Sequence, residues 1–168
     1  MYAFAYERPA SLADVLAKIA SGGQALAGGQ TLIAALKQRL AQPESLIDLA
    51  GVPDLSGIKK EGNTLVIGAM TKHETVADSA EVQQLIPALA ALAGNIGDRQ
   101  VRAMGTMGGS VANNDPAADY PAACMALGAT IKTDKREVPA DEFFTGLFET
   151  ALDEGEMIVS VSFPKPEK

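Results

Sequence analysis

Two short glycine-rich segments constrain the fold of this 168-residue chain more than any other part of its sequence. The first spans 27–32, reads Ala-Gly-Gly-Gln-Thr-Leu, and separates a short apolar stretch from a helical pattern. The second spans 105–109 and contains three glycines. Glycine lacks a Cβ and adopts positive φ readily, so such segments form tight turns and let a ligand approach the backbone closely.

The elements around the first segment predict a small α/β lobe. Ser11 and Asp14 have the spacing of a capping box, and the apolar residues that follow recur at helical spacing. The expected elements are, in order, a helix from Ser11 that Gly22 and Gly23 end, a strand at 24–27, a helix with Leu32, Ile33, Leu36 and Leu40 on one face that Pro43 ends, and a strand at 45–49. This order predicts a βαβ crossover with a preceding helix, in a lobe at 1–53.

The pattern changes after Pro53 and predicts a larger α+β lobe at 54–164, with a short tail at 165–168. The expected elements are a hairpin of 58–60 with 64–67, a helix from Pro87 with Leu85, Leu89, Leu92 and Ile96 on its buried side, and strands at 129–132 and 157–163. In the last strand we expect Met157, Val159, Val161 and Phe163 to share one face.

The second glycine-rich segment lies within a longer stretch, 104–116, that reads as a loop rich in glycines, hydroxyls and asparagines. Such a loop suits a backbone nest around a diphosphate, although a purely structural Ω-loop is the alternative. The first segment could equally be a plain turn in which Thr31 caps the next helix. Taken together, the two segments predict a dinucleotide held between the lobes, with one anion-binding turn from each.

The composition excludes several classes of function. The formal net charge is −7 and no run of lysines or arginines occurs, so the chain does not look like a nucleic-acid binder. The single cysteine cannot form an internal disulfide or hold an iron–sulfur cluster alone, and one histidine makes a zinc site improbable. We therefore expect no metal. We also expect no signal peptide, no membrane span and a cytoplasmic location.

The stretch 97–121 resembles the signature of the medium, FAD-binding subunit of aerobic carbon monoxide dehydrogenase and its xanthine-dehydrogenase-like relatives, the molybdenum hydroxylases. The segment 27–32 is similar to that family's other FAD loop, and 67–71 and 156–158 also fit. The resemblance implies the two-lobed α+β FAD-binding fold of the vanillyl-alcohol-oxidase-like (PCMH) type. Met107 stands where the family usually has a smaller branched apolar residue, a change that flexible methionine can accommodate in packing.

The resemblance also implies which residues contact FAD. The segments 28–32 and 105–109 would hold the pyrophosphate. Asn113, Asp115 and Asp119 would line the flavin, ribityl or ribose side, and Met157 would approach the flavin or adenine. The complete set of expected cofactor-binding residues is Ala27, Gly28, Gly29, Gln30, Thr31, Leu32, Gly105, Thr106, Met107, Gly108, Gly109, Asn113, Asp115, Asp119 and Met157.

By the same resemblance, the protein is an oxidoreductase subunit that transfers electrons. A molybdenum-cofactor large subunit and a [2Fe–2S] small subunit are the implied partners, and FAD passes electrons to an external acceptor. The family's subunit continues into a C-terminal domain where this chain stops. A free-standing or truncated flavin-binding module without turnover of its own is the alternative. A third, weaker alternative is a nucleotide-binding structural protein that never holds FAD.

No catalytic acid or base is predicted. His73 follows a strand and is expected to start a helix without a charge role, with a general base as the alternative. Cys124 lies in an alanine-rich stretch and is expected to be a buried, inert thiol. Arg99 and Arg102 could form a surface charge cluster with Asp98, or one of them could neutralise a phosphate. Asp115 and Asp119 could also be read as metal ligands, but their setting favours hydrogen bonding to a ligand rich in hydroxyls.

Overall fold

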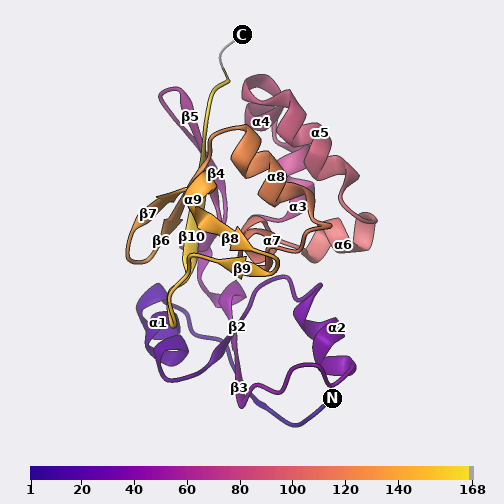
Figure 1. Ribbon diagram of the computed structural model, residues 1–168, viewed down its shortest axis with the longest axis vertical. Coiled ribbons are helices and arrows are strands. Elements are labelled where there is room, and N and C mark those ends of the chain that lie inside the picture. The colour runs from indigo at the N-terminus through magenta and orange to yellow at the C-terminus, as the bar shows by residue number, and fades with distance from the viewer. Residues whose placement is uncertain (167–168) are drawn as a thin grey trace.

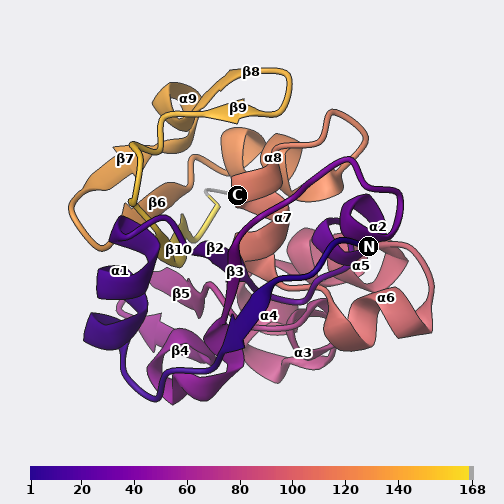
Figure 2. The same cartoon turned by 90° about the horizontal axis from the view of Figure 1, so that it is seen from below.

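The computed structural model describes residues 1–166 and contains two separate main sheets (Figure 1). The smaller sheet is parallel, in the order β1-β3-β2. Its elements are β1 (Ala5–Glu7), α1 (Leu12–Ala20), β2 (Gln24–Leu26), α2 (Leu32–Lys37) and β3 (Ser45–Asp48). Seen from below, α1 and α2 lie on opposite sides of these strands (Figure 2). The βαβ crossover expected from the sequence is therefore present as β2-α2-β3.

The larger sheet is antiparallel, in the order β4-β5-β10-β6-β7. Its strands are β4 (Ile58–Glu61), β5 (Thr64–Gly68), β6 (Thr130–Thr133), β7 (Glu137–Pro139) and β10 (Ile158–Pro164), with a side hairpin of β8 (Phe144–Gly146) and β9 (Glu149–Thr150). The helices are α3 (His73–Asp78), α4 (Ala80–Leu85), α5 (Pro87–Asn95), α6 (Arg99–Met104), α7 (Met107–Asn113), α8 (Asp119–Ala126) and α9 (Ala140–Phe143). Two 3₁₀ turns, Leu49–Gly51 and Pro53–Leu55, join the two parts.

Several of the expected local signals are confirmed. The Ser11 hydroxyl accepts a hydrogen bond from the Asp14 amide at 3.2 Å and starts α1. Gly22 takes a φ of 96° and ends the helix. The hairpin turns at Gly62, whose φ is 61°, and Pro87 is the first residue of α5. The predicted tail at 165–168 lies partly outside the described residues.

Two expectations about the smaller sheet are wrong. The helix that begins at Leu32 ends at Lys37 rather than near Pro43, because Arg39 takes a left-handed φ of 60°. Leu40 is consequently 78% exposed instead of buried. Strand β1 was not expected from the sequence, because this three-residue edge strand has only exposed residues and shows no apolar alternation.

Strand β10 contributes to both hydrophobic cores of the molecule. The predicted single apolar face is wrong, because a bulge between Ile158 and Ser160 shifts the register against β6. Val161 and Phe163 therefore pack in the core of the larger sheet, whereas Met157 and Val159 pack against α1 and β3 residues such as Val15 and Ile47. This strand joins the two parts and brings its start to the boundary between them.

Candidate functional site

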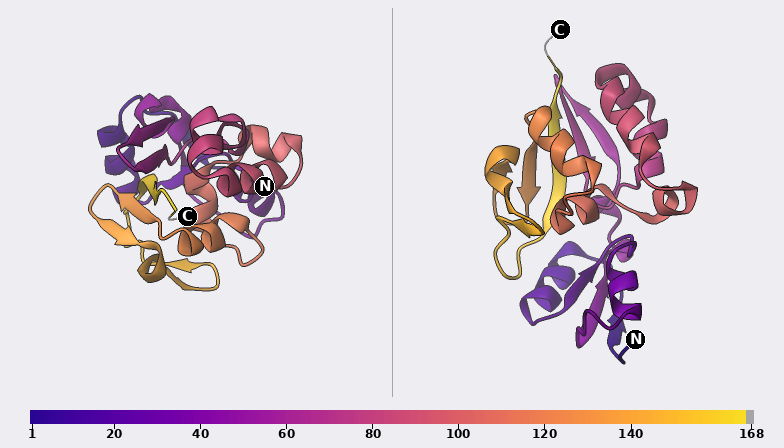
Figure 3. Two further views of the ribbon diagram at one scale, coloured as in Figure 1. Left: turned by 90° about the horizontal axis from the view of Figure 1, so that it is seen from above. Right: turned by 45° about the vertical axis from the view of Figure 1, so that its right-hand side comes forward.

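A cleft of about 550 Å³ lies where the two parts of the molecule meet. Figure 3 (right) shows the part with the smaller sheet set apart below the larger one, with the chain crossing between them. The cleft is lined by Gln24, Ala25, 27–32, Ala35 and Leu49 from the first part, and by Ala69, Met70, His73, Ile96, Val101, Gly105, Thr106, 108–110, Ala112, Asn113, Asp115, Ala117, Ala118, Met157 and Ile158 from the second.

The first glycine-rich segment lines this cleft and has backbone amides without a partner. Within the part of the chain that the structure describes, the amides of residues 28–32 donate no hydrogen bond to the protein. Gly29 has a φ of 71°, which only glycine adopts without strain. The Thr31 side chain makes no hydrogen bond that caps α2, so its hydroxyl is not used in capping. The segment is therefore a set of unused donors that can bind an anion.

The second glycine-rich segment is not the loop expected from the sequence. It is the start of α7, with the Thr106 hydroxyl accepting the Gly109 amide at 3.2 Å. The Met107 amide donates to the Thr71 carbonyl at 2.9 Å, and the Gly108 amide donates to the Ala69 carbonyl at 2.8 Å. These amides bind protein rather than forming an open nest. A Cβ on Gly108 would lie 2.6 Å from the Ala69 Cβ, so glycine there allows α7 to approach the end of β5.

The two segments contact each other directly. A Cβ on Gly28 would lie 2.1 Å from the Met104 carbonyl oxygen and 2.8 Å from the Gly105 Cα. Gly105 in turn lies beside the His73 ring, because a Cβ there would be 2.5 Å from its Nε2 atom. These close approaches place the first segment against the start of α7, where both line the cleft.

The cleft brings together thirteen of the fifteen residues expected to contact a cofactor. The exceptions are Met107, the first residue of α7, which is completely buried, and Asp119, which is exposed outside the lining. Ala69 and Met70 also line the cleft, although neither was among the expected cofactor contacts. A signal for them was available, because 67–71 was part of the family resemblance.

The cleft contains no side chain of lysine or arginine among its described lining residues, and Asp115 is its one carboxylate. Arg102 donates to the carbonyls of Ile96 and Gly97 at 3.0 and 3.1 Å, and Arg99 is absent from the lining. The idea that either arginine neutralises a phosphate therefore has no support. Backbone amides and hydroxyls are the groups that the cleft offers to an anion.

The buried titratable groups near the cleft are held neutral. Burial lowers the pKa of His73 to about 4, so its imidazole is uncharged at neutral pH and has no charge role, as expected. Burial also raises the pKa of the Cys124 thiol to about 12, which makes it the inert, buried thiol predicted from the sequence. The Tyr120 ring packs 5.2 Å from the His73 ring, and burial raises its pKa.

Met157 is fixed at the cleft by its neighbours in the turn between β6 and β7. Its amide donates to an Asp134 carboxylate oxygen at 2.8 Å, and its carbonyl accepts from the Asp134 amide at 3.0 Å. The adjacent Glu156 side chain is fully buried and accepts hydrogen bonds from Thr133, from both Nε and a terminal nitrogen of Arg136, and from the Asp153 amide. The Arg136 guanidinium beside it lowers the pKa of Glu156 to about 2.

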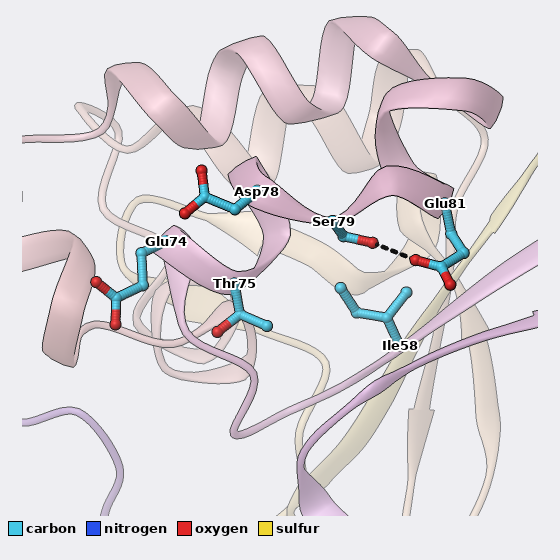
Figure 4. Close-up of a pocket in the computed structure, with 6 residues that line it drawn as sticks. All are labelled: Ile58, Glu74, Thr75, Asp78, Ser79 and Glu81. Atoms are coloured by element: carbon cyan, nitrogen blue, oxygen red, sulfur yellow. Dashed lines mark hydrogen bonds between the residues drawn. The ribbon is translucent and has the colours of Figure 1, made fainter.

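A second hollow of similar size, about 530 Å³, lies against α3 and α4 (Figure 4). It is lined by Ile58, Glu74, Thr75, Asp78, Ser79 and Glu81, and the Ser79 hydroxyl donates to Glu81 at 2.9 Å. Its carboxylates do not suit an anionic ligand.

No group of three or more metal-binding side chains occurs anywhere in residues 1–166. Among those residues, no helix is long and apolar enough to cross a membrane.

Residues 2–166 match the family described as the FAD binding domain in molybdopterin dehydrogenase. The chain belongs to this family. The carbon monoxide dehydrogenase medium chain of Hydrogenophaga pseudoflava is 42% identical over 96% of this chain and 58% of its own length. A solved structure of carbon monoxide dehydrogenase from that organism matches with a TM-score of 0.95 at 40% identity, over 99% of this chain and 60% of that one. Quinoline 2-oxidoreductase from Pseudomonas putida 86 matches with a TM-score of 0.95 at 35% identity, over 98% and 60%.

The family resemblance and the α+β fold expected from the sequence are both confirmed by these matches. FAD is the cofactor of the family, and the cleft fits its charged part. The free amides of 28–32 can bind a diphosphate, and glycine at position 28 lets this turn lie directly against the backbone of Met104 and Gly105. The chain thus spans 58% of the length of the Hydrogenophaga pseudoflava medium chain and 60% of the matched chain in each of the two solved structures.

Proposed function

We propose that the cleft holds FAD between two lobes, 1–53 and 54–164, with the diphosphate against the free amides of residues 28–32. The observation that carries this proposal is that residues 28–32 line the cleft and that their amides have no partner in the described chain. The start of α7 supports the turn through the contact of Gly28 with Gly105. Asn113, Asp115 and Met157 lie farther along the lining and would contact the remaining parts of the cofactor.

We further propose that the protein is the electron-transfer subunit of a molybdenum hydroxylase. Bound FAD would supply the redox chemistry, and the chain would bind, orient and shield it. The cleft supports this role because its two titratable side chains are Asp115 and a neutral His73, which form no acid–base pair in the described structure. A [2Fe–2S] small subunit would supply electrons, and a molybdenum-cofactor large subunit would oxidise the substrate.

FAD binding is the first test of this function. We expect the purified chain, titrated with FAD, to quench flavin fluorescence to a stoichiometric end point and to give the visible spectrum of bound oxidised flavin. FMN, which lacks the diphosphate bridge and the adenosine, is the matched control and should bind at least about tenfold more weakly. Equal affinity for FMN would exclude the diphosphate site, and no binding of either flavin would exclude the function.

The electron-transfer role needs a separate experiment with partner chains. We expect the chain to form a complex with co-expressed iron–sulfur and molybdenum subunits of its own complex, in which the substrate reduces the bound flavin. If flavin binds to the chain but stays oxidised in such a complex, the protein is the free-standing flavin-binding module. The two candidate functions are thus distinguished by flavin reduction and not by flavin binding.

Two threonines at equivalent positions should respond differently to alanine. Thr31 makes no cap hydrogen bond, so Thr31→Ala should leave the unfolding free energy within about 0.5 kcal/mol and weaken FAD binding about tenfold, the effect of one hydrogen bond to a charged group. Thr106 caps α7, so Thr106→Ala should lower the unfolding free energy by about 1 kcal/mol. Chemical denaturation and FAD titration of both variants measure the contrast. An unchanged FAD affinity in Thr31→Ala would remove this hydroxyl from the site.

A further inference from the structure

His73 occupies a position in the cleft that its backbone and its neighbours determine. It is the first residue of α3, and its amide donates to the Gly105 carbonyl at 3.0 Å. Its ring is held between Gly105, which has no side chain to displace it, and the ring of Tyr120. The side chain is only 5% exposed, yet it belongs to the cleft lining. The ring therefore lies in the floor of the cleft, beside the contact between the two glycine-rich segments.

The imidazole has no hydrogen-bond partner in the described protein. Nδ1 is buried without a partner, and no described residue bonds Nε2 either. Buried polar side-chain atoms in native proteins nearly always have a partner, so an exception calls for an explanation. Because Nδ1 is the ring nitrogen that is fully enclosed, Nε2 is the nitrogen that a ligand in the cleft can reach.

The surroundings of the ring favour a neutral hydrogen-bonding group over a charged one. No lysine or arginine lines the described cleft, and Asp115 is the one carboxylate in it. Tyr120, on the other side of the ring, keeps its phenol protonated because burial raises its pKa. A neutral imidazole carries one N–H donor and one acceptor nitrogen, and so can bond a polar atom without bringing a counter-charge into the cleft.

We propose that His73 is a cofactor-binding residue, whose Nε2 atom hydrogen-bonds a polar atom of FAD at the floor of the cleft where the two glycine-rich segments meet. The proposal rests on the proposed function, because it assigns a residue to the same cleft. It gives the unpartnered imidazole a partner and explains why Gly105 leaves room for the ring. From the sequence, His73 was expected to start a helix without a charge role, with a general base as the alternative, and was not among the expected cofactor contacts.

The variant that tests this is His73→Phe, which keeps an aromatic ring against Tyr120 and removes both ring nitrogens. We expect about tenfold weaker FAD binding by calorimetry or fluorescence quenching. We also expect the unfolding midpoint of the FAD-free protein to stay close to that of wild type, because removing a buried nitrogen without a partner offsets the extra volume of the phenyl ring beside Gly105. A purely structural histidine would show the reverse, with altered stability and an FAD affinity within twofold of wild type, and that result would overturn the proposal.

Tyr120→Phe is the matched control. The Tyr120 hydroxyl is the other buried, unpartnered side-chain atom of the described chain, but Tyr120 does not line the cleft. Removal of the Tyr120 hydroxyl should therefore leave FAD affinity unchanged. An equal loss of affinity in both variants would mean that packing behind the cleft, rather than a bond from His73, controls binding, and would count against the proposal.

The chain offers a second measurement that needs no variant, because it contains one histidine. In tag-free protein labelled with ¹⁵N-histidine, one pair of imidazole nitrogen signals reports on His73 alone. We expect FAD to shift the Nε2 signal as it gains a hydrogen bond, while the ring stays neutral. A spectrum that saturating FAD leaves unchanged would overturn the assignment even though FAD binds. Absence of FAD binding by wild type would instead reject the proposed function, so the two failures are distinguishable.

Discussion

Gly28→Val is expected to weaken FAD binding by about 100-fold or more, a loss of ~3 kcal/mol of binding free energy. The reason is the position of the added side chain. Its Cβ would lie 2.1 Å from the Met104 carbonyl oxygen and 2.8 Å from the Gly105 Cα, and both are backbone atoms that cannot rotate away. The turn must move off the start of α7, and this displaces the free amides of 28–32 that would bind the diphosphate. FAD titration followed by fluorescence measures the effect.

Gly94→Ala is the control for this substitution. Gly94 lies in α5, and a Cβ there would be 3.8 Å from the Ala77 Cβ, which is ordinary contact. The variant should bind FAD like wild type and gain about 0.5–1 kcal/mol of stability, because alanine is the better helix former.

Chemical denaturation of Gly28→Val should also show an unfolding free energy lower by about 1–3 kcal/mol, because of the forced overlap. Wild-type FAD affinity in a folded Gly28→Val protein would contradict the proposed site.

The local pattern around the first glycine-rich segment was sufficient to predict its structure. A strand, a turn at Gly28 and Gly29 and a helix from Leu32 follow from apolar spacing and glycine chemistry within a few residues. The second segment could not be predicted in the same way. Glycine disfavours helices, so 105–109 read as a loop, but the carbonyls of Ala69 and Thr71 bind the first amides of α7. Contacts from residues more than thirty positions away overrode the local preference.

The same distinction applies to the candidate cleft. Ala27 and Gly28 were predicted because they belong to a recognisable segment, whereas His73 reaches the cleft only through the packing of α3 against Gly105. Met107 was predicted as a contact for its place in the segment, but helical geometry turns it into the core. Similarly, the bulge at the start of β10 was invisible in the sequence, and it is what directs Met157 toward the smaller sheet.

Glu156→Gln is expected to lower the unfolding free energy by about 2 kcal/mol at pH 7. Breaking a buried ion pair typically costs about 3–5 kcal/mol, but Arg136 remains partly exposed and can be hydrated once its partner is neutral. Glu154→Gln is the matched control, because Glu154 lies two residues earlier, is exposed and has no ion pair among the described residues, and it should change stability by less than about 0.5 kcal/mol. Because Glu156 precedes Met157, FAD affinity should also fall several-fold in Glu156→Gln alone.

The Glu156 carboxylate and the His73 imidazole affect the stability of the protein in different pH ranges. The folded pKa of Glu156 is lowered to about 2, so its contribution is fully present above the ordinary glutamate pKa and disappears as the pH falls toward 2. The folded pKa of His73 is lowered to about 4, so the unfolded chain takes up the proton first, and stability falls between the ordinary histidine pKa and pH 4. Wild type should therefore lose stability in two successive acid steps. Glu156→Gln should remove the acid step at lower pH, and His73→Phe should remove the step at higher pH. Denaturation curves measured across this pH range test the assignment, and a variant that kept both steps would contradict it.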